Sequence, residues 1–413
     1  MKEPGGSVEA GERMQVLDVL RGAALFGVFL ANFIGFAGVD VMATEQQLLS
    51  LRSGPLDYAV GELVHWLIND KANTLFAFLF GLGFYLQMQR LGARGVDFDR
   101  IYLRRLWVLF AMGVIHTLFL WLWDILNLYA LAGFALFALR RLDDRRLLGW
   151  GIVLALFGRT ADRMFLGVVG ADWHGYTSPF SDAAVLARQA ASQAGDYWRL
   201  FSLFFEFTLV DWLLSGLIVG WFLYALGRFM IGAWVGRQRW LQRAGELLPQ
   251  YRRVMRVALP LGLIGEGLAV ILGHALEFDR LPSDGVVRTL VFVLHLLSVP
   301  LLAAGYVAGL VVAMHTPLGR RILMPFAAAG RMALSNYVAQ SFIYAFVLFG
   351  VGPGLALAGR IGATAVVGIV VVGYGAQIAL SVWWLGRYRY GPLEWLWRGL
   401  TYGEWPRFRS VAA

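Results

Sequence analysis

Residues 16–38 form an apolar stretch that constrains this chain more than any other feature of its sequence. A stretch of this length can cross a bilayer as a helix. It nevertheless carries Asp18, Arg21 and Asn32, which share one face of a helix because of their spacing. Arg21 and Asn32 would lie about three turns apart, roughly 16 Å along the axis. Polar groups at that depth are costly in lipid, so this face must contact protein or a water-filled cavity.

Apolar runs of similar length recur along all 413 residues, of which 59% are hydrophobic and 15% are charged. An average soluble domain has about 25% charged residues. This composition predicts an all-α, polytopic integral membrane protein with about ten transmembrane helices, in contact with membrane lipids. The expected spans are residues 16–37, 69–89, 104–123, 125–140, 147–168, 206–233, 255–276, 289–314, 323–349 and 361–386.

The arginines cluster in alternate loops between these spans, near residues 90–105, 140–146, 237–256, 320–321 and 387–389. The positive-inside rule therefore predicts that both termini are cytoplasmic. The resulting organisation is a tail at 1–15, a transmembrane domain at 16–386 and a cytoplasmic segment at 387–413. The net charge of +9 does not predict nucleic-acid binding, since the basic residues lie in short loops.

Four loop segments are more than short connectors. Residues 56–68 are amphipathic and either lie in the membrane interface or lengthen the second span. The outer loop 169–205 carries Asp172 and His174 and is expected to form a surface helix at 182–200. The inner basic segment 237–256 is expected to be an interfacial helix. Residues 387–413 are rich in tryptophan, tyrosine and arginine, which is typical of a membrane-interface belt. The alternative is a docking surface for an anionic, aromatic ligand, since arginine binds phosphates and tryptophan stacks on a base.

The third span places His116 on the same helix face as Arg105, with Asp124 in the tight turn that follows. Histidine is the side chain best suited to act as a general base near neutral pH, and a carboxylate partner would orient its ring. The alternative is a packed, hydrogen-bonded histidine without a catalytic role. His65 is a weaker candidate, and His274 and His295 are expected at the membrane interface.

Other polar residues mark the later spans. Lys71 either snorkels to the headgroups or takes part in binding. Glu266 must be paired or protonated, because a bare charge at its depth is costly. Asn336 and Gln340 share one face of the ninth span. No cysteine is present and no zinc motif occurs, so we expect no metal site.

Several runs resemble the YeiB-like family of bacterial membrane proteins, whose domain has been labelled one of unknown function. They are RMQVLDVLRGAALFGVFLANF, KANTLFAFLFGLG, GVIHTLFLWLWDILNLYAL, GRMALSNYVAQS and GPLEWLWRGLTYG. The opening LD-x-LRG is distantly similar to that of membrane acyltransferases, including bacterial O-acetylases of surface glycans and lysosomal heparan glucosaminide N-acetyltransferase. The resemblance implies a multi-pass protein of the bacterial inner membrane that uses acyl-CoA, such as acetyl-CoA, as co-substrate.

The resemblance also assigns expected roles. Arg21 matches the arginine of the Arg-x10-His pattern in the O-acetylases, but Asn32 stands where they have histidine, and an amide cannot act as a base. We therefore expect His116, with Asp124, to supply the base. Arg21, Arg331, Trp395 and Arg398 would bind the coenzyme. Asp18, Asn32, Lys71, Asn336 and Gln340 would bind substrate.

Three function classes stay open at this stage. The first is acyl transfer to a glycan, lipid or small-molecule acceptor. The second is a transporter or flippase that uses the buried charged residues as a substrate or proton path, although no internal repeat is evident. The third is a membrane scaffold, which buried charges disfavour. The sequence identifies neither the acceptor nor the oligomeric state, and a homodimer is compatible with it.

Overall fold

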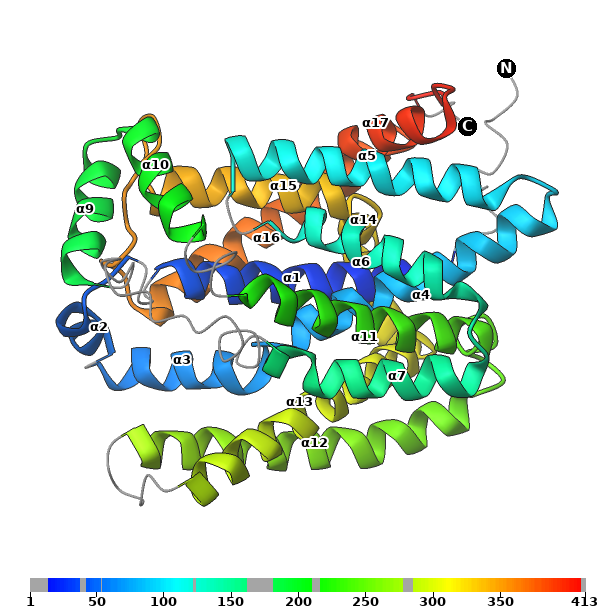
Figure 1. Cartoon of the computed structure of the whole chain (residues 1–413), viewed down its shortest axis with the longest axis horizontal. Helices are drawn as coiled ribbons and strands as arrows, with labels where there is room; N and C mark the ends of the chain where they lie inside the picture. Colours follow the sequence, from blue (N-terminus) through cyan, green and yellow to red (C-terminus); the bar gives the residue numbers. More distant parts are fainter. Residues whose placement is uncertain are drawn as a thin grey trace.

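The computed structural model describes residues 14–37, 42–52, 54–121, 124–161, 181–209, 216–277 and 285–409. Within these ranges every regular element is a helix, and the β structure is limited to one isolated bridge between Tyr388 and Arg409. The longer helices run along the long axis of the molecule (Figure 1). The predicted all-α class is confirmed.

Six described helices are long and apolar enough to cross a membrane. They are α1 (Gln15–Ala37), α5 (Phe98–Phe119), α11 (Leu217–Arg237), α12 (Leu248–Glu277), α13 (Gly285–Met314) and α16 (Ala363–Leu385). The expected count of about ten spans is not confirmed. Two of the expected spans, α6 (Ile125–Ala138) and α7 (Asp144–Phe157), have 14 residues each. Such a helix is about 21 Å long, shorter than the roughly 30 Å hydrocarbon core.

One further expected span is interrupted, and another follows a separate helix. The ninth is divided at Met332 into α14 (Pro317–Arg331) and α15 (Ala333–Ile343), followed by a π-helical turn at Tyr344–Leu348. The second is preceded by a separate helix, so that α3 (Pro55–Leu67) and α4 (Lys71–Ala93) form a broken pair. Residues 56–68 therefore do form a helix, and its axis is not continuous with the span that follows.

The break between α3 and α4 lies at about half the depth of the helical bundle. Asp70 has φ +60°, a left-handed backbone conformation that residues other than glycine seldom adopt. Ala72, in the first turn of α4, packs against Gly27, where a Cβ would approach the Ala72 Cβ to 2.7 Å. Gly27 lies near the middle of α1, so α4 begins next to the midpoint of that helix.

The remaining elements are short helices and 3-10 turns. They are α2 (Glu45–Arg52), the 3-10 turns η2 (Leu139–Arg141) and η3 (Gly158–Thr160), α9 (Asp182–Gln193), α10 (Tyr197–Thr208) and α17 (Pro392–Tyr402). We call the end where α1 and α12 begin and α4 and α11 end the basic end, because the arginine-rich loops lie there. Helix α17 lies at the basic end and α2, α9 and α10 at the opposite end (Figure 1).

Two expectations for the loops need correction. The surface helix expected at 182–200 is two helices, because the chain turns at Gly195, which has φ +66°. The interfacial helix expected at 237–256 is wrong, since residues 238–247 form turns and α12 begins at Leu248. Asp172 and His174 lie outside the described residues.

Candidate functional site

A cavity of about 270 Å³ opens at the basic end; we call it the inner cavity. Of the described residues that line it, five are arginines, each from a different helix. They are Arg21 of α1, Arg90 of α4, Arg105 of α5, Arg331 of α14 and Arg398 of α17. The carboxylates at its wall are those of Asp18, 3.4 Å from Arg21, and Glu394. Arginine outnumbers carboxylate here, so the inner cavity favours an anionic ligand.

Helix α17 forms one wall of the inner cavity and is held to α5 by aromatic contacts. The Arg105 guanidinium lies 3.6 Å from the centroid of the Trp397 ring, and the Trp397 Nε1 donates to the Arg105 carbonyl at 3.0 Å. Arg398 stacks on Tyr390 at 4.8 Å. Trp395, which we expected to bind the coenzyme, packs on Trp405 and does not line the cavity.

Glu394 of α17 caps the first turn of α15. Its carboxylate accepts from the backbone N–H groups of Leu334 at 2.7 Å and Ser335 at 3.1 Å, and from the Ser335 hydroxyl at 2.5 Å. A carboxylate at a helix N-terminus satisfies donors that have no partner inside the helix. Burial nevertheless raises the pKa of Glu394 above its ordinary value.

At the closed end of the inner cavity, Tyr337 leads to a buried array of hydrogen bonds. The Tyr337 hydroxyl donates to Asp124 Oδ1 at 3.1 Å, and the same oxygen lies 3.0 Å from His116 Nδ1. The other ring nitrogen of His116, Nε2, is 2.9 Å from the Ser341 hydroxyl. The structure thus joins the two residues expected to be catalytic, and it adds Ser341 in the Ser–His–Asp order of catalytic triads.

Sequence reasoning missed both Tyr337 and Ser341. The available signal was the helical spacing of residues 335–341, which places Tyr337 and Ser341 one turn apart in a polar run. His116 itself is 3% exposed and does not line the inner cavity. Asn32 also lies outside the lining, so the two residues do not share this cavity.

The amides expected to bind substrate instead join α15 to α16. Asn336 donates to the Ala329 carbonyl at 3.2 Å and to the Ser381 hydroxyl at 3.0 Å. Gln340 donates to Gln377 at 3.1 Å. Both side chains are buried and neither lines the inner cavity. The amide N–H groups of both side chains are therefore paired inside the protein, whereas the buried Gln340 Oε1 accepts no hydrogen bond from the described residues.

A second and larger cavity, of about 730 Å³, opens at the opposite end; we call it the outer cavity. Its volume lies within the range of about 300–1,000 Å³ that is usual for ligand pockets. The described titratable residues that line it are Arg52, Asp57, Tyr58, Glu62, His65, Asp70, His274, Arg288 and His295. His274 contacts Glu62 near the mouth.

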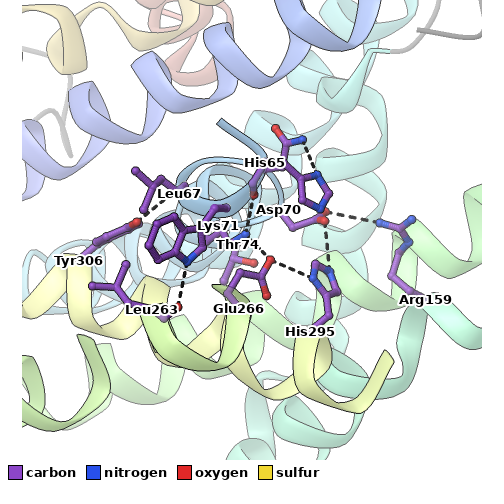
Figure 2. Close-up of polar contacts among 12 residues, drawn as sticks. His65, Leu67, Asp70, Lys71, Thr74, Arg159, Leu263, Glu266, His295 and Tyr306 are labelled. Carbon is purple, nitrogen blue, oxygen red and sulfur yellow. Dashed lines mark hydrogen bonds and ion pairs between the residues drawn. The ribbon is translucent and has the colours of Figure 1, made fainter. Parts of the chain in front are cut away.

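The deepest part of the outer cavity meets a group of charged residues at the α3–α4 break (Figure 2). We call Asp70, Lys71, Arg159, Glu266 and His295 the mid-depth cluster. The Lys71 ammonium is 2.5 Å from Glu266 Oε1, and the two side chains are 1% and 0% exposed. Arg159 lies 3.7 Å from Asp70 Oδ1. Lys71 is thus neither at the headgroups nor near His116.

His295 lies between two carboxylates of the mid-depth cluster. Its Nδ1 is 3.0 Å from Glu266 Oε1, and its Nε2 is 3.4 Å from Asp70 Oδ2. The expectation of an interfacial histidine did not anticipate this arrangement. Glu266 was expected to be paired or protonated, and it contacts both Lys71 and His295.

Comparisons with known proteins identify the family. The family model described as "Protein of unknown function (DUF418)" matches residues 235–404. The chain is 30% identical over 403 residues to the uncharacterized protein YeiB of Escherichia coli (strain K12), covering 94% of this chain and 96% of YeiB. It is 28% identical over 402 residues to the uncharacterized protein YxaH of Bacillus subtilis (strain 168), with 95% of each chain covered. The chain belongs to the YeiB-like DUF418 family.

The match of the DUF418 model includes residues from both cavities. Residues 235–404 contain Glu266 and His295 of the mid-depth cluster, and Arg331 and Arg398 of the inner cavity. Lys71 and His116 come from the N-terminal part of the chain, which lies outside that match but within alignments that cover 94–95% of this chain. The names of these relatives state no activity, so the function of this DUF418 protein has to be argued from the two sites.

Proposed function

We propose that this protein is a membrane-embedded acyltransferase that takes an acyl group from acyl-CoA and transfers it to a glycan, lipid or small-molecule acceptor. One observation carries the proposal. Arginines from five helices converge on a single cavity, and the closed end of that cavity leads through Tyr337 to the His116–Asp124 pair. Arginine binds phosphate oxygens in a bidentate manner, and coenzyme A carries several phosphates.

The inner cavity would hold the coenzyme at its open side. Arg21, Arg331 and Arg398 would bind the phosphates, and the thioester would point toward Tyr337. A volume of about 270 Å³ lies just below the usual range for ligand pockets of roughly 300–1,000 Å³. We therefore expect the cavity to enclose part of the coenzyme and to leave the remainder at the basic end, next to α17.

His116 would act as the general base. It would take the proton from the acceptor hydroxyl or amine as that group attacks the thioester carbonyl, and the carbon–sulfur bond would break with return of the proton to the leaving thiolate. Asp124 would orient the ring and stabilise the imidazolium. Because Tyr337 lines the cavity and His116 does not, this mechanism requires the Tyr337 side chain to rotate away.

The proposal is tested with membrane vesicles that contain the protein together with native acceptors. Labelled acetyl-CoA is added on the side of the vesicle membrane that the basic end of the protein faces. The label incorporated into the lipid and glycan fractions is then measured. His116→Ala should lower transfer by about 10²-fold or more, the usual contribution of a general base. His315→Ala, an exposed histidine that does not line the inner cavity, should leave it unchanged. Undiminished transfer by His116→Ala would overturn the assignment.

Coenzyme binding is tested separately on the purified protein by its thermal shift with acetyl-CoA. Arg398→Gln should weaken the shift, because this arginine lines the inner cavity. Arg321→Gln is the matched control, since Arg321 is exposed on α14 and lies outside the lining. Equal shifts in the two variants would contradict coenzyme binding in the inner cavity.

A transporter is the second candidate, and the α3–α4 break favours it. Broken helices that expose a helix N-terminus near the bilayer midplane are typical of transporter binding sites. Here α4 begins at Lys71 beside the midpoint of α1, and the two cavities open at opposite ends. Absence of any thermal shift with acetyl-CoA, together with solute uptake by proteoliposomes, would support this candidate over the acyltransferase.

A further inference from the structure

The protonation of His295 follows from its two contacts. Both ring nitrogens face carboxylate oxygens, Nδ1 that of Glu266 and Nε2 that of Asp70. A neutral imidazole has one N–H, so one of these contacts would set a nitrogen lone pair against an oxygen lone pair. Both contacts are attractive only when a further proton is present, as an imidazolium or on one of the carboxyl groups. The geometry therefore describes a cluster that holds one proton more than a neutral histidine between two carboxylates.

The charges around His295 make that proton exchangeable. Lys71 and Arg159 already balance the two carboxylates, so the additional proton gives the mid-depth cluster a net positive charge. A net charge is costly at this depth, whereas the two contacts of His295 favour it. The two effects therefore act in opposite directions on the binding of this proton.

Other polar and charged groups surround the cluster at greater distance. Tyr224 of α11 donates to the Asp70 carbonyl, and Tyr306 of α13 donates to the Leu67 carbonyl. The Lys71 ammonium donates a hydrogen bond to the backbone carbonyl of His65 on α3. Further off, Thr74 accepts from Arg228, and His274 contacts Glu62. Arg288, on the same helix as His295, lines the outer cavity and is exposed.

The outer cavity gives the cluster access to water. The side chains of His295 and Asp70 are 35% and 28% exposed and line this cavity, whereas Glu266 and Lys71 are buried behind them. We propose that the mid-depth cluster is a proton-binding site, in which one proton enters through the outer cavity and is held on His295 between Asp70 and Glu266. This site does not depend on the proposed acyl transfer.

Binding of the proton also acts on the α3–α4 break. Asp70 is the residue with φ +60° at the break, and its carboxylate is held by His295 and Arg159. Loss of the proton removes the positive charge of His295 and leaves one N–H for its two carboxylate neighbours, so the hold on Asp70 weakens while the Arg159 contact stays. The protonation state thus changes how firmly the start of α4 is fixed at mid-depth.

The site is tested by solid-state NMR of the full-length protein in lipid bilayers, with ¹⁵N-labelled histidine. The chain has six histidines, and His295→Gln identifies the signals of His295 by difference. We expect both ring nitrogens of His295 to carry protons at mildly acidic pH, and one proton to be lost as the pH rises. Asp70→Asn should lower the pH of that loss by about one unit or more, because one of the two carboxylate partners is then neutral.

His274→Gln is the matched control, since its partner Glu62 lies in the same cavity but outside the cluster. It should leave the His295 signals and their pH dependence unchanged. Far-UV circular dichroism confirms that each variant is folded. If Asp70→Asn fails to fold, Asp70→Glu, which keeps the charge but moves it, should shift the loss in either direction. A His295 that stays in one neutral tautomer at every pH, or that titrates identically in the Asp70 variants, overturns the proposal.

Discussion

The buried Lys71–Glu266 pair permits a quantitative prediction about stability, because its two members differ in their other partners. Glu266→Gln leaves the Lys71 ammonium, which is 1% exposed, with the His65 carbonyl but without a carboxylate at contact distance. Removal of one member of a buried ion pair costs about 3–5 kcal/mol of unfolding free energy. We expect Glu266→Gln to fall within this range.

The reverse substitution should cost less. Lys71→Met leaves Glu266 beside His295, whose Nδ1 is 3.0 Å away, so the carboxylate keeps a cationic partner. We expect a loss of about 2 kcal/mol, roughly half that of Glu266→Gln. The double variant removes both charges and should cost less than the sum of the single variants, by about 1–3 kcal/mol.

The assay is equilibrium unfolding of the four proteins in mixed detergent micelles, followed by tryptophan fluorescence and far-UV circular dichroism. The free energies are compared as a double-mutant cycle. The reasoning fails if the two single variants cost the same, or if their costs add in the double variant. Equal costs would mean that His295 does not serve as a second partner of Glu266, and additivity would mean that the pair is not coupled.

Two further predictions concern helix packing and α17. Gly81→Ala should destabilise the protein by about 1–3 kcal/mol, because a Cβ there would lie 1.9 Å from the Phe229 carbonyl oxygen of α11. Gly92→Ala is the control and should leave stability unchanged, because a Cβ there would have nothing within 4 Å. Equal melting temperatures of the two variants would contradict this prediction. Because burial raises the pKa of Glu394 above 4.5, docking of α17 should be strongest below that pH and weaken as the pH rises through the raised value. Protection of α17 from trypsin measures this, and a pH dependence that persists in Glu394→Gln would contradict the assignment to Glu394.

The overall character of the fold could be predicted from the sequence because apolar runs alone determine it. The all-α class and the positions of α1, α12, α13 and α16 follow from run length and hydropathy. The interruptions could not be predicted in this way, since hydropathy does not report backbone conformation. The run of Asn69, Asp70 and Lys71 was visible as a polar start to the second span, but a left-handed residue at mid-depth is fixed by contacts from other helices.

The same distinction separates the two sites. His116 and Asp124 are eight residues apart across a tight turn, so their pairing could be inferred from helix geometry, and Arg21 could be assigned to a basic inner end from its place in α1. The mid-depth cluster combines the α3–α4 break with residues far along the chain, among them Glu266, which is 195 positions from Lys71. The sequence required that Glu266 be either paired or protonated, because an isolated charge at that depth is costly. It could not select Lys71 and His295, because that choice depends on which helices pack together and in which register.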